Sequence, residues 1–278
     1  MQGIAGRLPM SSDKFPILEL DDHVLHKIAT ISGCSILRSC KKIYNVTTPK
    51  DRVFMSLSDN NIDIDEGLIR ASKRGVDGVV DLLLNAGANV HALDDRALAL
   101  ASDNGHVSVV DLLLKYHANV HANNQSALIL ASQNGHACVV DILLRAGADV
   151  HAHYDLALGL ASIYGHAYVV KLLLNAGANI HIDDERALAW ASKNGHADVV
   201  DILLGAGANV HAVDDYALRI ASRNGHVSVV DILLRAGANV HAHDDRALVL
   251  ASKYGHASVV TLLLEAGARY HHTDAPDE

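Results

Sequence analysis

The sequence predicts an all-α solenoid of stacked helix pairs, and three observations support this fold class. An Ala-Ser pair recurs every 30 residues without slippage, at Ala71, Ala101, Ala131, Ala161, Ala191, Ala221 and Ala251. A glycine keeps the same step from Gly75 to Gly255. Aromatic residues make up only 4% of the chain, which favours thin layers of Ala, Val and Leu over one thick core. A fixed period of this length is typical of repeat architectures.

Each unit is predicted to hold two short helices, as in residues 94–123, which read DDRALALASDNGHVSVVDLLLKYHANVHAN. Seven units run from about residue 64 to residue 273. In the first helix Leu98 and Ala101 form the apolar stripe, and the glycine that follows supplies a left-handed exit. An acidic residue is expected to cap this helix by accepting from free backbone N–H groups. The expected caps are Asp65, Asp95, Asp155, Asp215 and Asp245.

The second helix of this unit carries an apolar run that includes Val109, Val110 and Leu113. Oppositely charged residues four apart are expected to pair on its outer face, at Asp111/Lys115, Asp141/Arg145 and Asp231/Arg235. His117 replaces the helix-ending glycine and is expected to adopt a left-handed or otherwise altered exit. Because helices this short are marginal alone in water, the units must stack on one another.

The segments NGHVSVVDLLLKYHANVHA and YGHAYVVKLLLNAGANIHI resemble the ankyrin-repeat family. The family repeat usually has 33 residues and opens its first helix with T-P-L-H. Here Arg96, Ala97, Leu98 and Ala99 stand in that place, and three residues and the turn glycine are missing. The hairpin between repeats is therefore expected to be a stub, which disfavours binding through long fingers.

The first 50 residues do not follow the repeat, and they carry seven Lys/Arg against four Asp/Glu. The segment is similar to an F-box, a helical module that docks onto the adaptor subunit of cullin-type ubiquitin ligases. The residues that match its first helix and would bind the adaptor are Leu20, Val24, Leu25 and Ile28. The alternative is a helical cap over the first repeat, and Arg70, where other repeats have Leu, Ile or Trp, suits either interpretation. Residues 51–63 are expected to be a linker or half repeat, and 274–278 a disordered tail.

No constellation of residues predicts catalysis, a cofactor or a metal site. The histidines recur with the period, and equivalent side chains about 8–10 Å apart on neighbouring repeats cannot share one zinc ion. They are expected to make hydrogen bonds at helix starts and hairpins. The recurring serines lie beside core alanines, and no G-x-S-x-G, P-loop or H-E-x-x-H occurs. We therefore expect no enzyme.

Positions where the repeats differ predict the partner site. The third, sixth and tenth residues of each first helix share one stripe, which in the ankyrin family lines a concave groove. Repeat four departs most, with exposed Leu, Ile and Tyr expected beside Gly159, and Trp190 is expected in the core. Drift, or repacking that buries these side chains, is the alternative. The expected partner-binding residues are Tyr154, Leu156, Ile163, Tyr164, Arg186, Lys193, Tyr216, Arg219 and Arg223.

These features predict a protein-binding scaffold for a partner with an apolar and an acidic stretch. An F-box would make it a substrate adaptor for a ubiquitin ligase; the alternative is a plain binding or decoy module. The net charge of −9 disfavours binding to nucleic acid. The sequence contains no run of about 18 apolar residues, so a membrane span is not expected. Cys34, Cys40 and Cys138 fit reduced thiols of an intracellular monomer, in cytoplasm or nucleus. The arrangement resembles proteins of large DNA viruses, which would imply the host cytoplasm.

Overall fold

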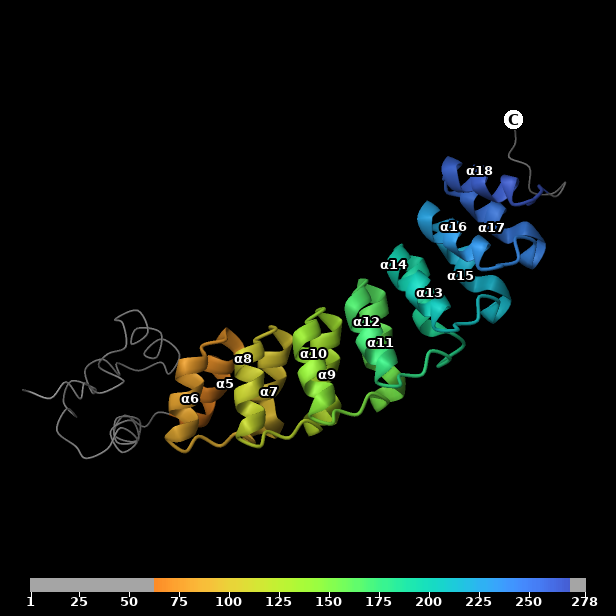
Figure 1. The fold of residues 1–278 in the computed structure, drawn as a ribbon. Coiled ribbons are helices and arrows are strands. Elements are labelled where there is room, and N and C mark those ends of the chain that lie inside the picture. The colour runs from red at the N-terminus through yellow and green to blue at the C-terminus, as the bar shows by residue number, and fades with distance from the viewer. Residues whose placement is uncertain (1–62, 271–278) are drawn as a thin grey trace, which may run out of the picture.

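The computed structural model describes residues 63–270, and the repeats form a curved stack of helix pairs (Figure 1). Within this range there are fourteen helices and no strands, so the predicted fold class is confirmed. The first helices of the seven repeats are α5 (Ile64–Arg74), α7 (Ala92–Asp103), α9 (Ala122–Gln133), α11 (Ala152–Tyr164), α13 (Arg186–Asn194), α15 (Ala212–Arg223) and α17 (Ala242–Lys253). The second helices are α6 (Asp77–Asn85), α8 (Val107–Lys115), α10 (Ala137–Arg145), α12 (Ala167–Asn175), α14 (Ala197–Gly205), α16 (Val227–Arg235) and α18 (Ala257–Glu265).

The core is one continuous layer that runs through all seven repeats. In repeat two, Leu98 and Ala101 of α7 are buried with Val109, Val110 and Leu113 of α8, as their spacing predicts. Neighbouring first helices lie closer together than neighbouring second helices. The buried side chains of the first helices are mostly small, with Ala and Ser beside one Leu in repeat two, whereas those of the second helices are Val and Leu. Stability therefore comes from stacking each thin layer on the next.

Three consecutive residues with left-handed backbone precede the right-handed part of the first helix in repeats two to seven. In repeat two they are Leu93, Asp94 and Asp95, with φ of 51°, 55° and 55°. This turn of non-glycine residues occupies the place of the longer family hairpin, which confirms the predicted stub. A left-handed residue other than glycine costs about 1–2 kcal/mol, so the surrounding contacts must hold the turn in place.

The acidic residue of this turn is not a helix cap, and that prediction was wrong. Asp95 is buried, and its Oδ1 accepts from the backbone N–H of Asn119 at 2.7 Å, 24 residues later. The same bond recurs from Asp65, Asp155, Asp215 and Asp245 to residues 89, 179, 239 and 269. A true side-chain cap occurs at α5, where Asp63 accepts from the N–H groups of residues 65 and 66. The carboxylate therefore links the start of the first helix of a repeat to the loop that follows the second helix of the same repeat.

Histidines join neighbouring repeats. Nε2 of His106 lies 3.0 Å from the carbonyl oxygen of Lys73, and because a carbonyl only accepts, Nε2 must be the donor. The same bond recurs at His136, His166, His196, His226 and His256. A second row, including His91, places Nδ1 next to the acidic residue of the turn. The predicted structural role of the histidines is confirmed.

Several smaller predictions also agree with the structure. The three ion pairs on the second helices form, with 2.6 Å between Lys115 Nζ and Asp111 Oδ2 in the first of them. His117 has a left-handed φ of 65° in place of the usual glycine. Cys138 is an exposed free thiol. The expected F-box-like residues, the segment 51–62 and the tail 274–278 lie outside the described residues.

Candidate partner-binding surface

The first helices present one continuous stripe of variable residues, which we call the first-helix surface. Positions in each repeat are counted from the residue directly before the acidic residue of the turn, which is position one. The surface consists of the third, sixth and tenth positions of each repeat, together with their exposed neighbours. In repeat four the third and tenth positions are Leu156 and Ile163. Both side chains are half-buried, and neither belongs to the buried core. They are less exposed than the sequence suggested, yet both remain partly exposed to solvent.

Tyrosines supply the most exposed apolar area of repeat four. Tyr154 lies in the left-handed turn and is 76% exposed. Tyr164 is the last residue of α11 and its ring stacks on His166, with 6.4 Å between the ring centroids. Tyr216 of α15 is exposed as well. Exposed aromatic side chains that keep a hydrogen-bonding group are common anchors of protein interfaces.

Trp190 is not a core residue, and that prediction was wrong. Its indole is half-buried because it lies across Gly159 of the preceding repeat. A Cβ on Gly159 would lie 2.7 Å from Cζ3 of the indole, so the glycine provides the space that the ring needs. The guanidinium of Arg186 lies over the same ring, 4.7 Å from its centroid. The indole therefore forms part of the first-helix surface.

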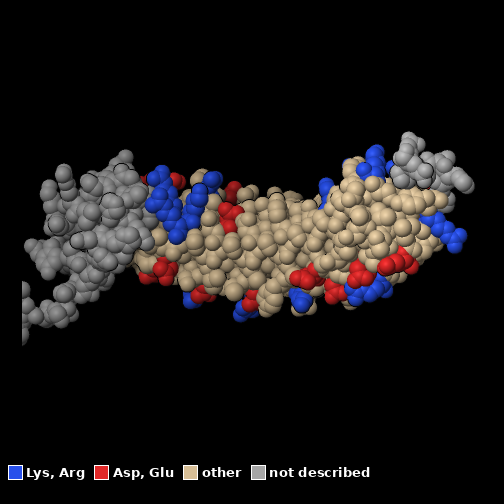
Figure 2. Space-filling view, turned by 90° about the horizontal axis from the view of Figure 1, so that it is seen from above, with Lys and Arg blue, Asp and Glu red and all other residues tan. Residues whose placement is uncertain are grey.

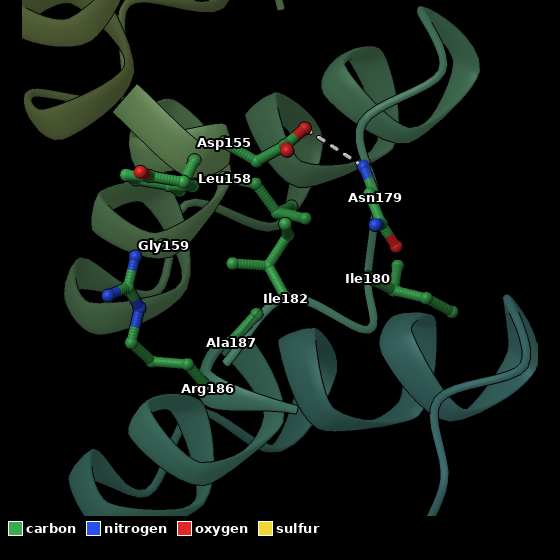
Figure 3. Close-up of a pocket in the computed structure, with 9 residues that line it drawn as sticks. Asp155, Leu158, Gly159, Asn179, Ile180, Ile182, Arg186 and Ala187 are labelled. Carbon is green, nitrogen blue, oxygen red and sulfur yellow. Dashed lines mark hydrogen bonds between the residues drawn. The ribbon is translucent and has the colours of Figure 1, made fainter. Parts of the chain in front are cut away.

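A shallow depression lies where repeats four and five meet (Figure 3). Figure 3 shows Asp155 accepting from the backbone N–H of Asn179. Tyr154, Leu158, Ile182 and Arg186 are among the residues that line it. The structure thus brings the predicted Tyr154 and Arg186 together.

The predicted basic residues are held by different partners. Arg186 pairs with Asp183 at 2.5 Å. Arg219 donates to the backbone oxygens of Val213 and Asp214 at 2.8 and 3.2 Å, and it lies 5.5 Å from the Tyr216 ring centroid. Lys193 and Arg223 are exposed. Backbone and aromatic contacts thus orient part of this basic set, and among residues 63–270 no carboxylate pairs with Arg219.

The sequence prediction missed two aromatic residues of this surface. Trp190 was assigned to the core, and Tyr254 was not singled out although it breaks the repeat pattern. In four other repeats the residue equivalent to Tyr254 is an asparagine whose amide donates to a backbone carbonyl, at Asn104, Asn134, Asn194 and Asn224. Departure from this pattern was the signal that could have found Tyr254.

We identify no catalytic or metal-binding site in the part of the chain that the structure describes. Residues 63–270 contain no group of three or more His, Cys, Asp or Glu placed to hold a metal ion. None of the helices in this range is long and apolar enough to cross a membrane. What the described surface offers is a row of aromatic, aliphatic and basic side chains suited to contact with another macromolecule.

The family assignment follows from the repeats themselves. A family model described as ankyrin repeats in three copies matches residues 68–154, 151–214 and 188–274. The chain belongs to the ankyrin-repeat family. No curated protein sequence matches it. Ankyrin repeats suggest a scaffold for protein–protein interaction.

Among solved structures, this ankyrin-repeat chain is similar to the human ASB11 ankyrin repeat domain. The two share 27% sequence identity with a TM-score of 0.64, and the match covers 73% of this chain and 99% of that one. The repeated helix pairs are thus common to both chains. In this ankyrin array, the left-handed turns connect repeats whose period is shortened to 30 residues.

Proposed function

We propose that this ankyrin-repeat protein binds a partner protein on the first-helix surface of repeats four to six. One observation carries the proposal: the aromatic and aliphatic side chains of repeat four stand next to the basic side chains of repeats five and six on one face. Leu156 and Ile163 lie outside the core, and the exposed Tyr154 lines the same depression as Arg186. Apolar anchors beside cations favour a partner segment that is both hydrophobic and acidic.

Truncating the apolar anchors tests this proposal. Leu156→Ala with Ile163→Ala should abolish capture of the partner, because a central anchor contributes about 2 kcal/mol or more to binding. The unfolding free energy should change by only about 1 kcal/mol or less, because both side chains lie outside the core. Affinity capture from cell extract, read by mass spectrometry, identifies the proteins that wild type retains and the variant loses.

Tyr168→Ala is the matched control for this experiment. Tyr168 is 67% exposed at the start of α12, on a second helix, so its loss should leave capture unchanged. Equal loss of the same proteins in both variants would show that no particular face is used. A large fall in the melting temperature of the Leu156/Ile163 variant would show that these side chains are structural.

A finer role as a ubiquitin-ligase adaptor is proposed from the N-terminal sequence alone. The F-box-like residues Leu20, Val24, Leu25 and Ile28 precede the repeats and would dock onto the ligase's adaptor subunit, placing the protein inside cells. Leu25→Asp with Ile28→Asp should then abolish pulldown of that adaptor and leave the melting curve of the repeats unchanged. If the double substitution unfolds the repeats, the segment is a cap, and the protein is a plain binding module.

A further inference from the structure

Charge is segregated along the first-helix surface. The right-handed parts of α13, α15 and α17 carry six basic residues and no acidic ones: Arg186, Lys193, Arg219, Arg223, Arg246 and Lys253. The matching parts of α7, α9 and α11 carry only Arg96 and Asp103 as charged residues. In Figure 2, one long edge shows blue side chains towards both ends and a largely uncharged stretch between them. The surface therefore changes from apolar to cationic where repeat five begins.

Four of these cations lack a carboxylate partner among the described residues, in a chain whose net charge is −9. They are Lys193, Arg223, Arg246 and Lys253, whereas Arg186 and Arg219 have the partners named above. On the second helices, by contrast, the cations of repeats two, three and six each pair with an aspartate four residues earlier. Lys171 of α12 has no such partner, but most of the cations that remain to be neutralised among the described residues lie on the first helices.

Two of these cations meet at one aromatic ring, across the boundary between repeats six and seven. The guanidinium carbon of Arg223 lies 5.2 Å from the ring centroid of Tyr254, and Nζ of Lys253 lies 5.9 Å from it. The ring's negative face attracts both cations, but the two like charges repel each other. A bound carboxylate would relieve this repulsion. We call Arg223, Lys253 and Tyr254 the repeat 6–7 clamp.

We propose that the partner contributes one extended acidic segment that lies along α13, α15 and α17. Its carboxylates reach the repeat 6–7 clamp, and an adjoining apolar stretch contacts Leu156 and Ile163 of α11. This inference rests on the proposed function. It extends the binding surface to repeat seven and fixes the spacing of the acidic residues in the partner segment. Helices packed about 8–10 Å apart and a strand rise of about 3.3 Å per residue match one acidic residue in every three.

An acidic protein segment fits this surface better than a nucleic acid. The exposed carboxylates of Asp183, Asp184, Asp214 and Asp244 lie in the left-handed turns of the same repeats. They would repel a continuous phosphate backbone, whereas a peptide can place its carboxylates only where the cations lie. The apolar half of the surface likewise offers phosphate nothing to pair with.

The test uses the full chain and a fluorescein-labelled synthetic peptide of 20 residues, with a leucine-rich block followed by glutamate at every third position. Arg223→Glu with Lys253→Glu should weaken its binding at least tenfold at low salt and reduce the salt dependence. The matched control is Arg145→Glu with Arg235→Glu, which changes the net charge equally on the second helices. The control should change the Kd by less than twofold.

Three results would overturn the inference: equal weakening in both variants, no binding of the peptide up to millimolar concentration, or tighter clamp-dependent binding of a 20-nucleotide single-stranded RNA. A failure of this kind is distinguishable from failure of the proposed function. If Leu156→Ala with Ile163→Ala still abolishes partner capture while the clamp variant binds the peptide normally, the partner surface stands. Only its extension to repeat seven would then be wrong.

Discussion

Trp190 fills the space above Gly159, a residue 31 positions earlier in the preceding repeat. The same spacing places the ring of His256 over Gly225, and five further His–Gly pairs repeat it. At these positions residue i of one repeat therefore faces residue i+31 of the next. At Gly159 and Trp190 this register pairs the smallest residue with the largest, whereas Ala99 and Leu130 hold the equivalent places two repeats earlier.

Gly159→Ala should destabilise the protein by about 1–2 kcal/mol, because the new Cβ overpacks the indole by more than the helix gains from alanine. The sign should reverse in a Trp190→Leu background, where alanine stabilises by about 0.5–1 kcal/mol. Chemical denaturation measures both effects, and Trp190, the single tryptophan, reports its own displacement by fluorescence. The same sign in both backgrounds would contradict the proposed contact.

Gly225 and Gly255 allow the role of the histidine rings to be isolated. Both glycines have a φ of +75°, but a Cβ on Gly225 would lie 2.5 Å from Nδ1 of His256, whereas one on Gly255 meets open space. Gly255→Ala should cost about 1 kcal/mol from backbone strain alone. Gly225→Ala should cost about 1–3 kcal/mol more, because the ring must also move. Equal losses in urea denaturation would show that the ring contact adds nothing.

Val213 has an unfavourable backbone conformation for a β-branched residue. Its φ is 50° in the left-handed turn of repeat six, where repeat three has Asn123 at 45°. Val213→Asn should stabilise the protein by about 0.5–1 kcal/mol, because asparagine tolerates this region better. The control is Val227→Asn, at a comparably exposed site in the right-handed α16, where a gain is not expected. An equal rise in melting temperature for Val227→Asn would show that the gain comes from replacing any exposed valine by a polar residue, and not from relief of the backbone at residue 213.

The sequence predicted the helix pairs and the core because each depends on contacts within one period. Leu98 and Ala101 lie three residues apart, and burial of that stripe follows from helical geometry. The role of Asp95 could not be predicted, because its acceptor bond reaches a backbone N–H 24 residues away. An acidic residue before an apolar run also matches the ordinary pattern of a helix cap. Trp190 was misassigned because the space it needs comes from a glycine in another repeat.

Asp215 shows whether the buried acidic residue acts through its charge or through its acceptor oxygen. Its Oδ1 accepts from the N–H of Asn239 at 2.7 Å. In repeat three Gln125 makes the equivalent bond through Oε1, at 3.2 Å to the N–H of Asp149, so a neutral acceptor is sufficient there. Asp215→Ala should cost about 1–3 kcal/mol, because the N–H loses its partner, and Asp215→Asn should retain most of the stability.

Asp214→Ala is the matched control, because Asp214 has nearly the same left-handed φ as Asp215 but is exposed and accepts from no backbone N–H at that distance along the chain. Alanine therefore meets the same backbone strain at both sites. The difference between the two losses reports the contacts of the buried carboxylate, which are the bond from the Asn239 N–H and the contact with Nδ1 of His211. Hydrogen exchange at the amide of Asn239 gives a direct readout. Its protection should fall in Asp215→Ala but persist in Asp215→Asn and Asp214→Ala. Equal loss of protection in the asparagine and alanine variants of Asp215 would show that the negative charge, and not the acceptor, holds the loop.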